Sequence, residues 1–444
     1  MHMHSKKLYR RHISPPVVIA GNFLLLILIG TLLLKLPIAT ERPITWIDAL
    51  FTVTSATTVT GLIVFDPGST LTLFGEIVLL SLIQLGGIGL MVFAVAILLL
   101  LGRKVGMQNR IYLQESFSFQ TLGGMVKFVR QILLFVLIVE GIAIIILSLH
   151  WVPTFGLRDG IYYSVFHVIS AFNNAGFSLF PDNLAQFVSD PLVNLVLSSL
   201  LIIGGLGFVV VLDLVKNKSF VHWSLHTKMM ITGTIALNCV ATVTIFVLEF
   251  NNTHTIADFS LADKALASYF QAVSPRTAGF NTISIGDMED PSLLFTMLLM
   301  FIGGGSASTA SGIKLTTFMI IVIATLSYFR SIREPHLFGR TIKFDIIFRS
   351  LAIATVSTMI VFGFIFILTI IETIPVFPLA FEVFSAFGTV GLSMGVTEDF
   401  SAIGRVLLCV VMFLGRIGPL TLFFLLLKPK KESFRYPYDQ VQSG

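Results

Sequence analysis

The chain has 444 residues, of which 55% are hydrophobic and only 12% carry a charge. Soluble domains contain about 25% charged residues, so the shortage of charge for a water-facing surface excludes a soluble enzyme. The remaining class is a polytopic membrane protein, whose apolar side chains face lipid as well as the protein interior.

Eight apolar runs follow one another along the chain, and most are long enough to cross a hydrocarbon core of about 30 Å. One run is too long for a plain span and is interrupted by ten small or polar residues, from Gly303 to Gly312. The predicted spanning helices cover residues 17–40, 71–101, 131–150, 192–215, 229–250, 292–329, 351–372 and 403–427.

Basic and acidic residues gather in alternate connections between the predicted spans. The two ends of the chain and three alternate connections hold 21 of the 29 Lys and Arg, whereas the other four connections hold 17 of the 24 Asp and Glu. By the positive-inside rule, both termini are expected in the cytoplasm and the acidic connections outside. The net charge of +5 is therefore a topology signal, and no nucleic-acid partner is expected.

A pattern of Phe, Ser and Gly occurs four times in the outer segments. Phe precedes the Gly by ten residues in three copies and by nine in the third, and Ser precedes it by six with the same offset. A second glycine cluster follows each copy after 24 to 28 residues. The four copies end at Gly61, Gly176, Gly279 and Gly391.

Each copy is preceded by a short amphipathic segment, too short to cross the membrane. These segments, 46–57, 160–172, 262–274 and 378–387, are expected to enter from outside and turn back. The predicted fold is an all-α polytopic membrane protein with four tandem span–pore-loop–span repeats around a central pseudo-fourfold pore. The predicted repeats cover 17–101, 126–216, 228–329 (with its second span broken at 303–314) and 344–428, between cytoplasmic segments 1–16 and 429–444.

Backbone that is not helical at membrane depth must face protein or a water-filled cavity. Four such turns around one axis would point carbonyl oxygens inward, where they replace the hydration water of K⁺. Glycine at the turn permits a positive φ and close approach of the four backbones. The only metal expected is K⁺, held by carbonyls. The predicted filter residues are Thr58, Val59, Thr60, Gly61, Asn173, Asn174, Ala175, Gly176, Arg276, Thr277, Ala278, Gly279, Gly388, Thr389, Val390 and Gly391.

The glycines also have a purely structural interpretation, because small residues let membrane helices pack closely. Four copies on one side of the membrane argue against this packing role for the glycines of the turns. For Gly86-Gly87 and Gly204-Gly205 in the second cluster, the packing role is favoured. The two cysteines, Cys239 and Cys409, lie inside apolar runs and have no metal-binding or disulfide spacing. No catalytic constellation occurs, so the chain is not expected to be an enzyme.

The four turn segments resemble the superfamily of K⁺ transporters Trk, Ktr and HKT over about residues 15–428. With eight spans, the chain is most similar to the membrane subunit of bacterial Ktr systems. The resemblance implies K⁺ preference with Gly at position 61 and Na⁺-dependent uptake at the bacterial cytoplasmic membrane. It further implies a homodimer on a cytoplasmic ring of RCK-type (KtrA/KtrC-like) regulatory subunits, which bind ATP, ADP or NAD-like nucleotides; no cofactor is expected in this chain.

The interruption of the sixth run suggests a gate. Gly and Ser disfavour a helix interior, and the freed backbone survives where it lines a cavity. The resemblance implies an intramembrane gate loop here; the alternative is a kinked helix. The predicted gate residues are Gly303, Gly304, Gly305, Ser306, Ala307, Ser308, Thr309, Ala310, Ser311, Gly312, Lys314 and Arg416.

Four charged or amide side chains need separate interpretations. An arginine in mid-span is costly, and Arg416 is expected to hinder cations at the gate, or else to pair with a carboxylate such as Glu140. Asn173 and Asn174 are expected to brace the filter from behind. Arg276 is expected to brace a carbonyl or to pair with an acid such as Asp263.

The predicted function is K⁺ uptake through a gated, carbonyl-lined filter within one protomer. A secondary transporter with alternating access, such as a K⁺/Na⁺ symporter, is disfavoured because its halves would be inverted, whereas all four repeats point the same way. A less selective monovalent cation channel stays open as an alternative. A non-conducting scaffold gives no account of four re-entrant turns.

Overall fold

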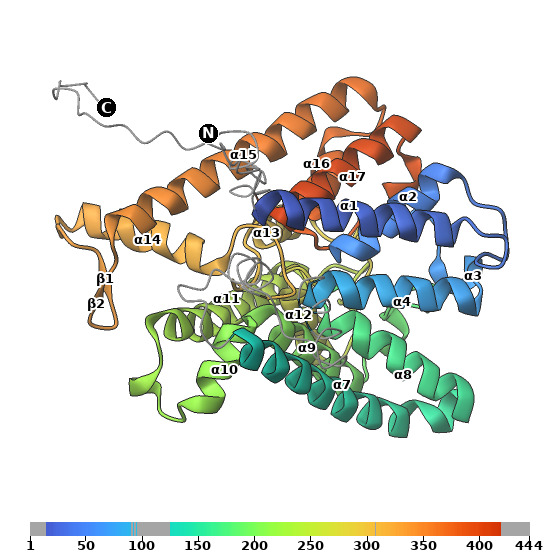
Figure 1. Ribbon diagram of the computed structural model, residues 1–444, viewed down its shortest axis with the longest axis horizontal. Coiled ribbons are helices and arrows are strands. Elements are labelled where there is room, and N and C mark those ends of the chain that lie inside the picture. Colours follow the sequence, from blue (N-terminus) through green and yellow to red (C-terminus); the bar gives the residue numbers. More distant parts are fainter. Residues whose placement is uncertain (1–14, 90–91, 93–94, 96–124, 307, 419–444) are drawn as a thin grey trace, which may run out of the picture.

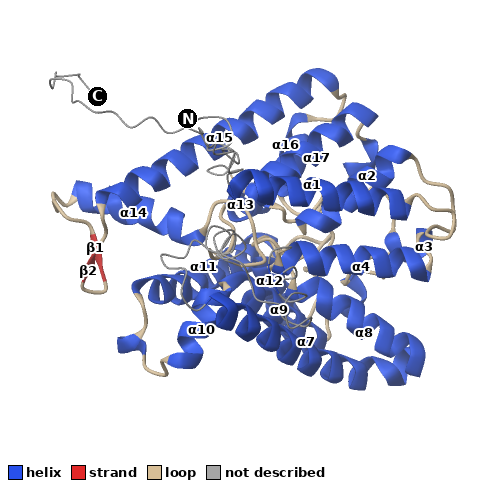
Figure 2. Cartoon of the chain, viewed as in Figure 1, coloured by secondary structure: helices blue, strands red, loops and turns tan. Residues whose placement is uncertain are grey.

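The computed structural model describes residues 15–89, 92, 95, 125–306 and 308–418. In this part the regular secondary structure is helical apart from one short hairpin, and loops connect the elements (Figures 1 and 2). The helices come in four successive groups, each with a long helix, a short helix and then further helices. The predicted terminal segments, most of the first cytoplasmic connection, Ala307 and residues after Gly418 lie outside the described residues.

The first two groups share this order. The first consists of α1 (Pro15–Leu34), α2 (Trp46–Thr58), α3 (Pro67–Thr70) and α4 (Leu73–Ile88). The second consists of α7 (Met125–Phe155), α8 (Leu157–Phe172), η1 (Ala185–Phe187), α9 (Pro191–Leu206), α10 (Phe208–Lys216) and η2 (Phe220–His222).

The third and fourth groups repeat this order of helices. The third consists of α11 (Leu225–Glu249), α12 (Leu261–Val273), α13 (Asp290–Phe301), α14 (Leu315–Phe329) and the strands β1 (His336–Leu337) and β2 (Arg340–Thr341), which pair antiparallel. The fourth consists of α15 (Phe344–Ile371), α16 (Val376–Gly388), η3 (Thr397–Asp399) and α17 (Ala402–Ile417).

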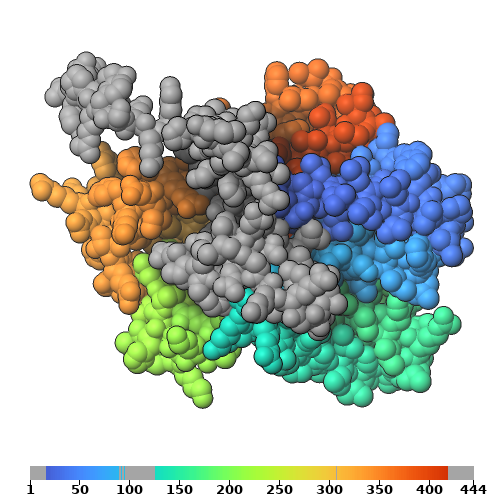
Figure 3. All heavy atoms as spheres, in the orientation of Figure 1, coloured from blue at the N-terminus to red at the C-terminus, as the bar shows by residue number. Residues whose placement is uncertain are grey.

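The four groups follow one another around the molecule, and the fourth returns beside the first (Figure 3). A contact between these two groups closes the circle: Arg405 Nη1 on α17 lies 2.5 Å from the Asp48 carboxylate on α2. The same Asp48 also caps α2, because the Thr45 hydroxyl accepts from its backbone N–H while its carboxylate accepts from the Thr45 N–H.

Within the described residues, four helices are long and apolar enough to cross a membrane: Val17–Leu34, Val126–Phe155, Leu225–Glu249 and Phe344–Ile371. They lie in α1, α7, α11 and α15, the first helix of each group. At most a third of each apolar stretch is buried, and leucines such as Leu28 and Leu149 are exposed. Apolar side chains in this number on the outside belong to a lipid-facing surface.

The second span of the second repeat is not one helix, so the prediction of a continuous span over 192–215 is wrong. α9 ends at Leu206 and α10 begins at Phe208, with a bend of 95° between them. Gly207 has φ 97°, which interrupts a right-handed helix. Gly89 (φ 96°) and Gly418 (φ 86°) end α4 and α17 in the same way.

In three groups the later helix packs closely on the end of the short helix, through a glycine of the second cluster. A Cβ atom at each of these glycines would collide with a backbone carbonyl of the short helix, so no larger residue fits. The pairs are Gly86 with Thr57, Gly204 with Phe172, and Gly415 with Phe387.

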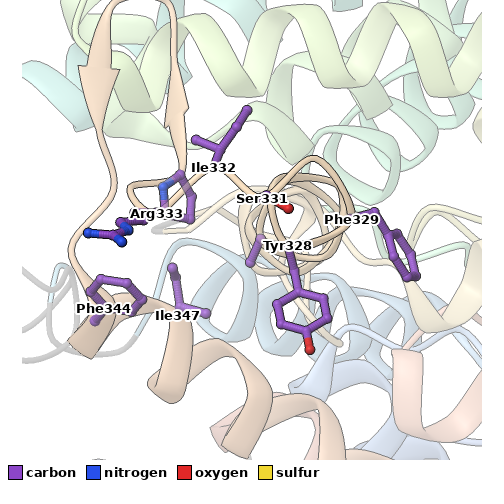
Figure 4. A pocket seen from close by; sticks show the side chains of 9 residues that line it. Tyr328, Phe329, Ser331, Ile332, Arg333, Phe344 and Ile347 are labelled. Carbon is purple, nitrogen blue, oxygen red and sulfur yellow. The ribbon is translucent and has the colours of Figure 1, made fainter.

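The hairpin β1–β2 and the adjoining ends of α14 and α15 project from the body (Figure 1). A cavity of about 620 Å³ lies here. Its walls include Tyr328, Phe329, Arg333 and Phe344 (Figure 4), and no predicted filter or gate residue lines it.

Replacing Gly415 by Ala is expected to lower the free energy of unfolding by about 1–3 kcal/mol, because the added methyl overpacks the contact with Phe387. Gly363→Ala in the same group is the control, since no atom lies within 4 Å of its Cβ position. Thermal unfolding of the purified proteins measures both. Equal stability of the two variants would contradict the packing role.

Candidate functional site

Each short helix ends in the same unusual backbone conformation. Within four residues of the end of each helix lies a residue with left-handed φ, and a glycine with positive φ comes two residues later. L-residues rarely adopt this conformation, so four occurrences mark a structure with a defined purpose. The pairs are Val59 (59°) and Gly61 (95°), Asn174 (59°) and Gly176 (68°), Thr277 (72°) and Gly279 (75°), and Thr389 (48°) and Gly391 (91°).

The four glycines form a closed ring. A Cβ atom on each would contact the carbonyl oxygen of the residue that precedes the next glycine, and the fourth returns to the first. The contacts run from Gly61 to Ala175, from Gly176 to Ala278, from Gly279 to Val390 and from Gly391 to Thr60. The structure thus brings all four predicted filter segments together, in chain order around one centre.

The amide groups of these segments are bonded to the short helices behind them. The N–H of the residue before each glycine donates to the carbonyl of the repeated serine, at 2.7 to 2.9 Å. The serine hydroxyls add a second bond. Ser55 and Ser385 accept from the N–H of Gly61 and Gly391, each at 3.0 Å, whereas Ser170 and Ser274 donate to the carbonyls of Phe177 and Phe280.

The carbonyl oxygens of the same segments have no such partners. Within the described part of the chain, no donor is bonded to the carbonyls of residues 59–61, 174–176, 277–279 or 389–391. Nearly all of these residues are buried. Because buried carbonyls are almost always paired, this ring is a concentrated set of acceptors that lacks donors.

Behind the second segment, Asn173 connects the site to two other helices. Its side-chain amide donates to the Ile169 carbonyl at 2.8 Å and to Gln84 Oε1 at 2.5 Å. Gln84 in turn donates to both oxygens of Glu140, at 3.1 and 3.2 Å. Gln84 and Glu140 were not predicted at this site, and no spacing in the sequence relates them to Asn173.

Asn174 bonds to side chains rather than to the backbone. Its amide donates to Thr277 Oγ1 at 3.3 Å, and its Oδ1 accepts from Thr309 at 3.4 Å. The second and third segments are therefore linked directly to each other and to the predicted gate. In the first segment, the hydroxyls of Thr58 and Thr60 are 2.8 Å apart.

Neither predicted partner of Arg276 is present. Its guanidinium donates to Asn238 Oδ1 at 3.1 Å and to Thr234 Oγ1 at 3.4 Å, both on α11. Asp263 instead accepts from Ser260 at the start of α12. Within the described residues, the Arg276 side chain is thus bonded to polar side chains of α11 and to no backbone carbonyl.

The described residues between Phe301 and Leu315 are not helical, so the alternative of a kinked helix is wrong. Ile302 and Ile313 form a parallel bridge that closes the loop, and Gly303 N donates to the Ile313 carbonyl at 2.8 Å. Within the loop, Lys314 Nζ donates to the Ala310 carbonyl at 2.8 Å.

The loop lies against the end of the second filter segment. Gly305 N donates to the Gly205 carbonyl at 2.7 Å, and Thr309 N donates to the Gly204 carbonyl at 3.3 Å. The Thr309 hydroxyl reaches the Phe172 carbonyl at 3.5 Å, directly behind Asn173 in the chain. Two backbone N–H groups of the loop, those of Gly305 and Thr309, are therefore satisfied by the second group of helices.

Arg416 joins the loop to the first group. Its guanidinium donates to the Thr309 carbonyl, to Ser311 Oγ at 3.2 Å, and to the carbonyls of Gly86 and Gly87, the last at 3.1 Å. All four acceptors are neutral. Arg416 forms no ion pair within the described residues, so the alternative pairing with a carboxylate such as Glu140 is wrong, and Glu140 is bonded to Gln84 instead.

Comparison with known proteins agrees with this geometry. The model of the TrkH family, described as cation transport protein, matches residues 3–436. The chain is 51% identical over 431 residues to Ktr system potassium uptake protein B of Bacillus subtilis, with 97% of each chain covered. It is 36% identical over 448 residues to potassium/sodium uptake protein NtpJ of Enterococcus hirae, with 99% of each covered.

A solved structure supports the fold. The potassium transporter TrkH from Vibrio parahaemolyticus matches with a TM-score of 0.75 at 19% identity, over 96% of this chain and 87% of that chain. The prediction of an all-α polytopic membrane fold is thereby confirmed. The chain belongs to the TrkH family of cation transport proteins, as its four turn segments predicted.

Proposed function

We propose that this protein takes up K⁺ across the bacterial cytoplasmic membrane, as the pore subunit of a Ktr-type system. The observation that carries the proposal is the ring of buried carbonyl oxygens without donors around the four glycines. A dehydrated cation is the partner that such oxygens can take at membrane depth, and carbonyl rings suit K⁺. The membrane potential, worth about 2.3 kcal/mol per charge per 100 mV, drives uptake.

The names of two relatives restrict the choice of transported cation. The B. subtilis protein is named for potassium uptake and the E. hirae protein for potassium and sodium uptake. We therefore assign K⁺ as the transported ion and Na⁺ as an activator. The working assembly in this proposal is a homodimer on a cytoplasmic RCK-type ring that binds the regulatory nucleotide, with both termini in the cytoplasm.

Gly61→Ser tests the filter. The serine Cβ would collide with the Ala175 carbonyl, so the ring opens and the K⁺/Na⁺ permeability ratio falls about tenfold, the equivalent of about 1.4 kcal/mol. Growth of a K⁺-uptake-deficient bacterium at low K⁺ and cation flux in liposomes measure the effect. Gly21→Ser is the control, because nothing lies within 4 Å of its Cβ position. An unchanged ratio in the Gly61 variant would overturn the filter assignment.

The loop 303–314 acts as the gate in this proposal, and Arg416 holds it closed. The loop is bonded to the second group through Gly204 and Gly205, and Arg416 ties it to the first group through Gly86 and Gly87. A guanidinium presents several donors in one fixed plane, which makes it suited to join two sets of carbonyls. Moving the loop requires these bonds to break.

Two substitutions distinguish the effect of the Arg416 hydrogen bonds from the effect of its positive charge. Arg416→Ala is expected to raise K⁺ flux about tenfold or more, since it removes hydrogen bonds worth on the order of 1.5–3 kcal/mol. Arg416→Lys keeps the charge but loses the planar set of donors, and is expected to raise flux by a smaller factor. Flux in liposomes with matched protein amounts is the measurement. A lower flux in both variants at normal expression would show that Arg416 supports the structure instead.

A further inference from the structure

The four short helices carry a buried polar side chain three residues before the repeated serine. At this spacing it lies on the same face of the helix as the serine that holds the filter segment. These residues are Thr52, His167, Gln271 and Glu382, and none is more than 1% exposed. Their chemistry differs at each position although the surrounding backbone is alike.

In the second group, His167 holds the chain just beyond the filter glycine. Its Nε2 lies 3.0 Å from the Ser178 hydroxyl, which is 3.2 Å from its other acceptor, the Asn183 carbonyl, and Nε2 also accepts from Leu179 N–H at 3.4 Å. Because Nε2 accepts, Nδ1 carries the proton and donates to the Tyr163 carbonyl at 2.8 Å. Phe180 N–H then donates to Ser178 Oγ at 3.0 Å.

In the fourth group, Glu382 makes the same set of contacts. Its Oε1 accepts from the Ser393 hydroxyl at 2.5 Å and from Met394 N–H at 3.3 Å, and its Oε2 accepts from Thr397 at 3.0 Å. Gly395 N–H donates to Ser393 Oγ at 2.9 Å. Both serines stand two residues after their filter glycine, so an imidazole and a carboxylate perform one task at equivalent positions.

The first and third groups lack this brace. In the described part of the chain, Thr52 Oγ1 and both polar atoms of the Gln271 amide have no hydrogen-bond partner. The residues two after the filter glycine are Ile63 and Asn281, and the Asn281 amide donates to the nearby Ile283 carbonyl. The glycine ring places the second and fourth groups opposite each other.

We infer that His167 and Glu382 are positioning residues for the filter, which brace its outer end across one diagonal only. Each is a hydrogen-bond acceptor for the serine hydroxyl and the backbone N–H that follow the glycine. They thereby fix the chain that carries the carbonyls of Gly176 and Gly391. On the other diagonal, at Gly61 and Gly279, the equivalent Thr52 and Gln271 make no such hydrogen bond within the described residues. This inference rests on the filter proposed above and adds two residues that set its selectivity.

Matched substitutions test the brace. Glu382→Leu and His167→Leu are each expected to lower the K⁺/Na⁺ permeability ratio about fivefold, the change that corresponds to one lost hydrogen bond of about 1 kcal/mol. Glu382→Gln and His167→Gln keep an acceptor oxygen and are expected to restore most of the ratio. Gln271→Leu and Thr52→Val make comparable changes at the equivalent positions of the unbraced diagonal, and are expected to leave it unaltered.

The permeability ratio from reversal potentials in liposomes is the measurement, since it does not depend on how much protein folds. Ser393→Ala and Ser178→Ala give milder versions, with an expected decrease of about twofold. Wild-type ratios in Glu382→Leu and His167→Leu, or an equal loss in Gln271→Leu, would overturn the brace while leaving the filter intact. A wild-type protein without K⁺ preference would overturn both.

Discussion

The structure depends on how backbone carbonyls are satisfied at membrane depth. Helices satisfy their own carbonyls, and lipid satisfies none. Eight residues with positive φ take the chain out of helical geometry at the ends of α2, α8, α12 and α16. The N–H group between the two residues of each pair is bonded to the serine carbonyl behind it, while the carbonyls of these segments have no donor among the described residues.

The same constraint explains why glycine occurs where the groups meet. In the ring, a side chain on Gly279 would occupy the position of the Val390 carbonyl, and a side chain on Gly391 that of Thr60. Behind the ring, Gly204 permits α9 to approach the last carbonyl of α8. Close backbone contact therefore has two roles. In the ring it brings the carbonyls together, and behind the ring it lets the supporting helices pack against the short helices.

Much of this arrangement could be predicted because it repeats. The spacing of Phe, Ser and Gly located the short helices to within a few residues of α2, α8, α12 and α16. The bend at Gly207 was missed, because Gly-Gly-Leu-Gly inside an apolar run is compatible with either packing or a break. The pairings of Asn173 with Gln84 and of Arg276 with Asn238 join residues far apart in the chain. One sequence holds no signal for such contacts.

Arg416 has a consequence that follows from its acceptors. Three carbonyls and one hydroxyl orient the guanidinium, yet none of them carries a negative charge. None of these partners neutralises its charge, which in the proposed mechanism would raise the energy of an ion in the filter. By thermodynamic reciprocity, an ion that occupies the filter must weaken the hold of Arg416 on the loop to the same degree. External potassium would in this way favour its own admission.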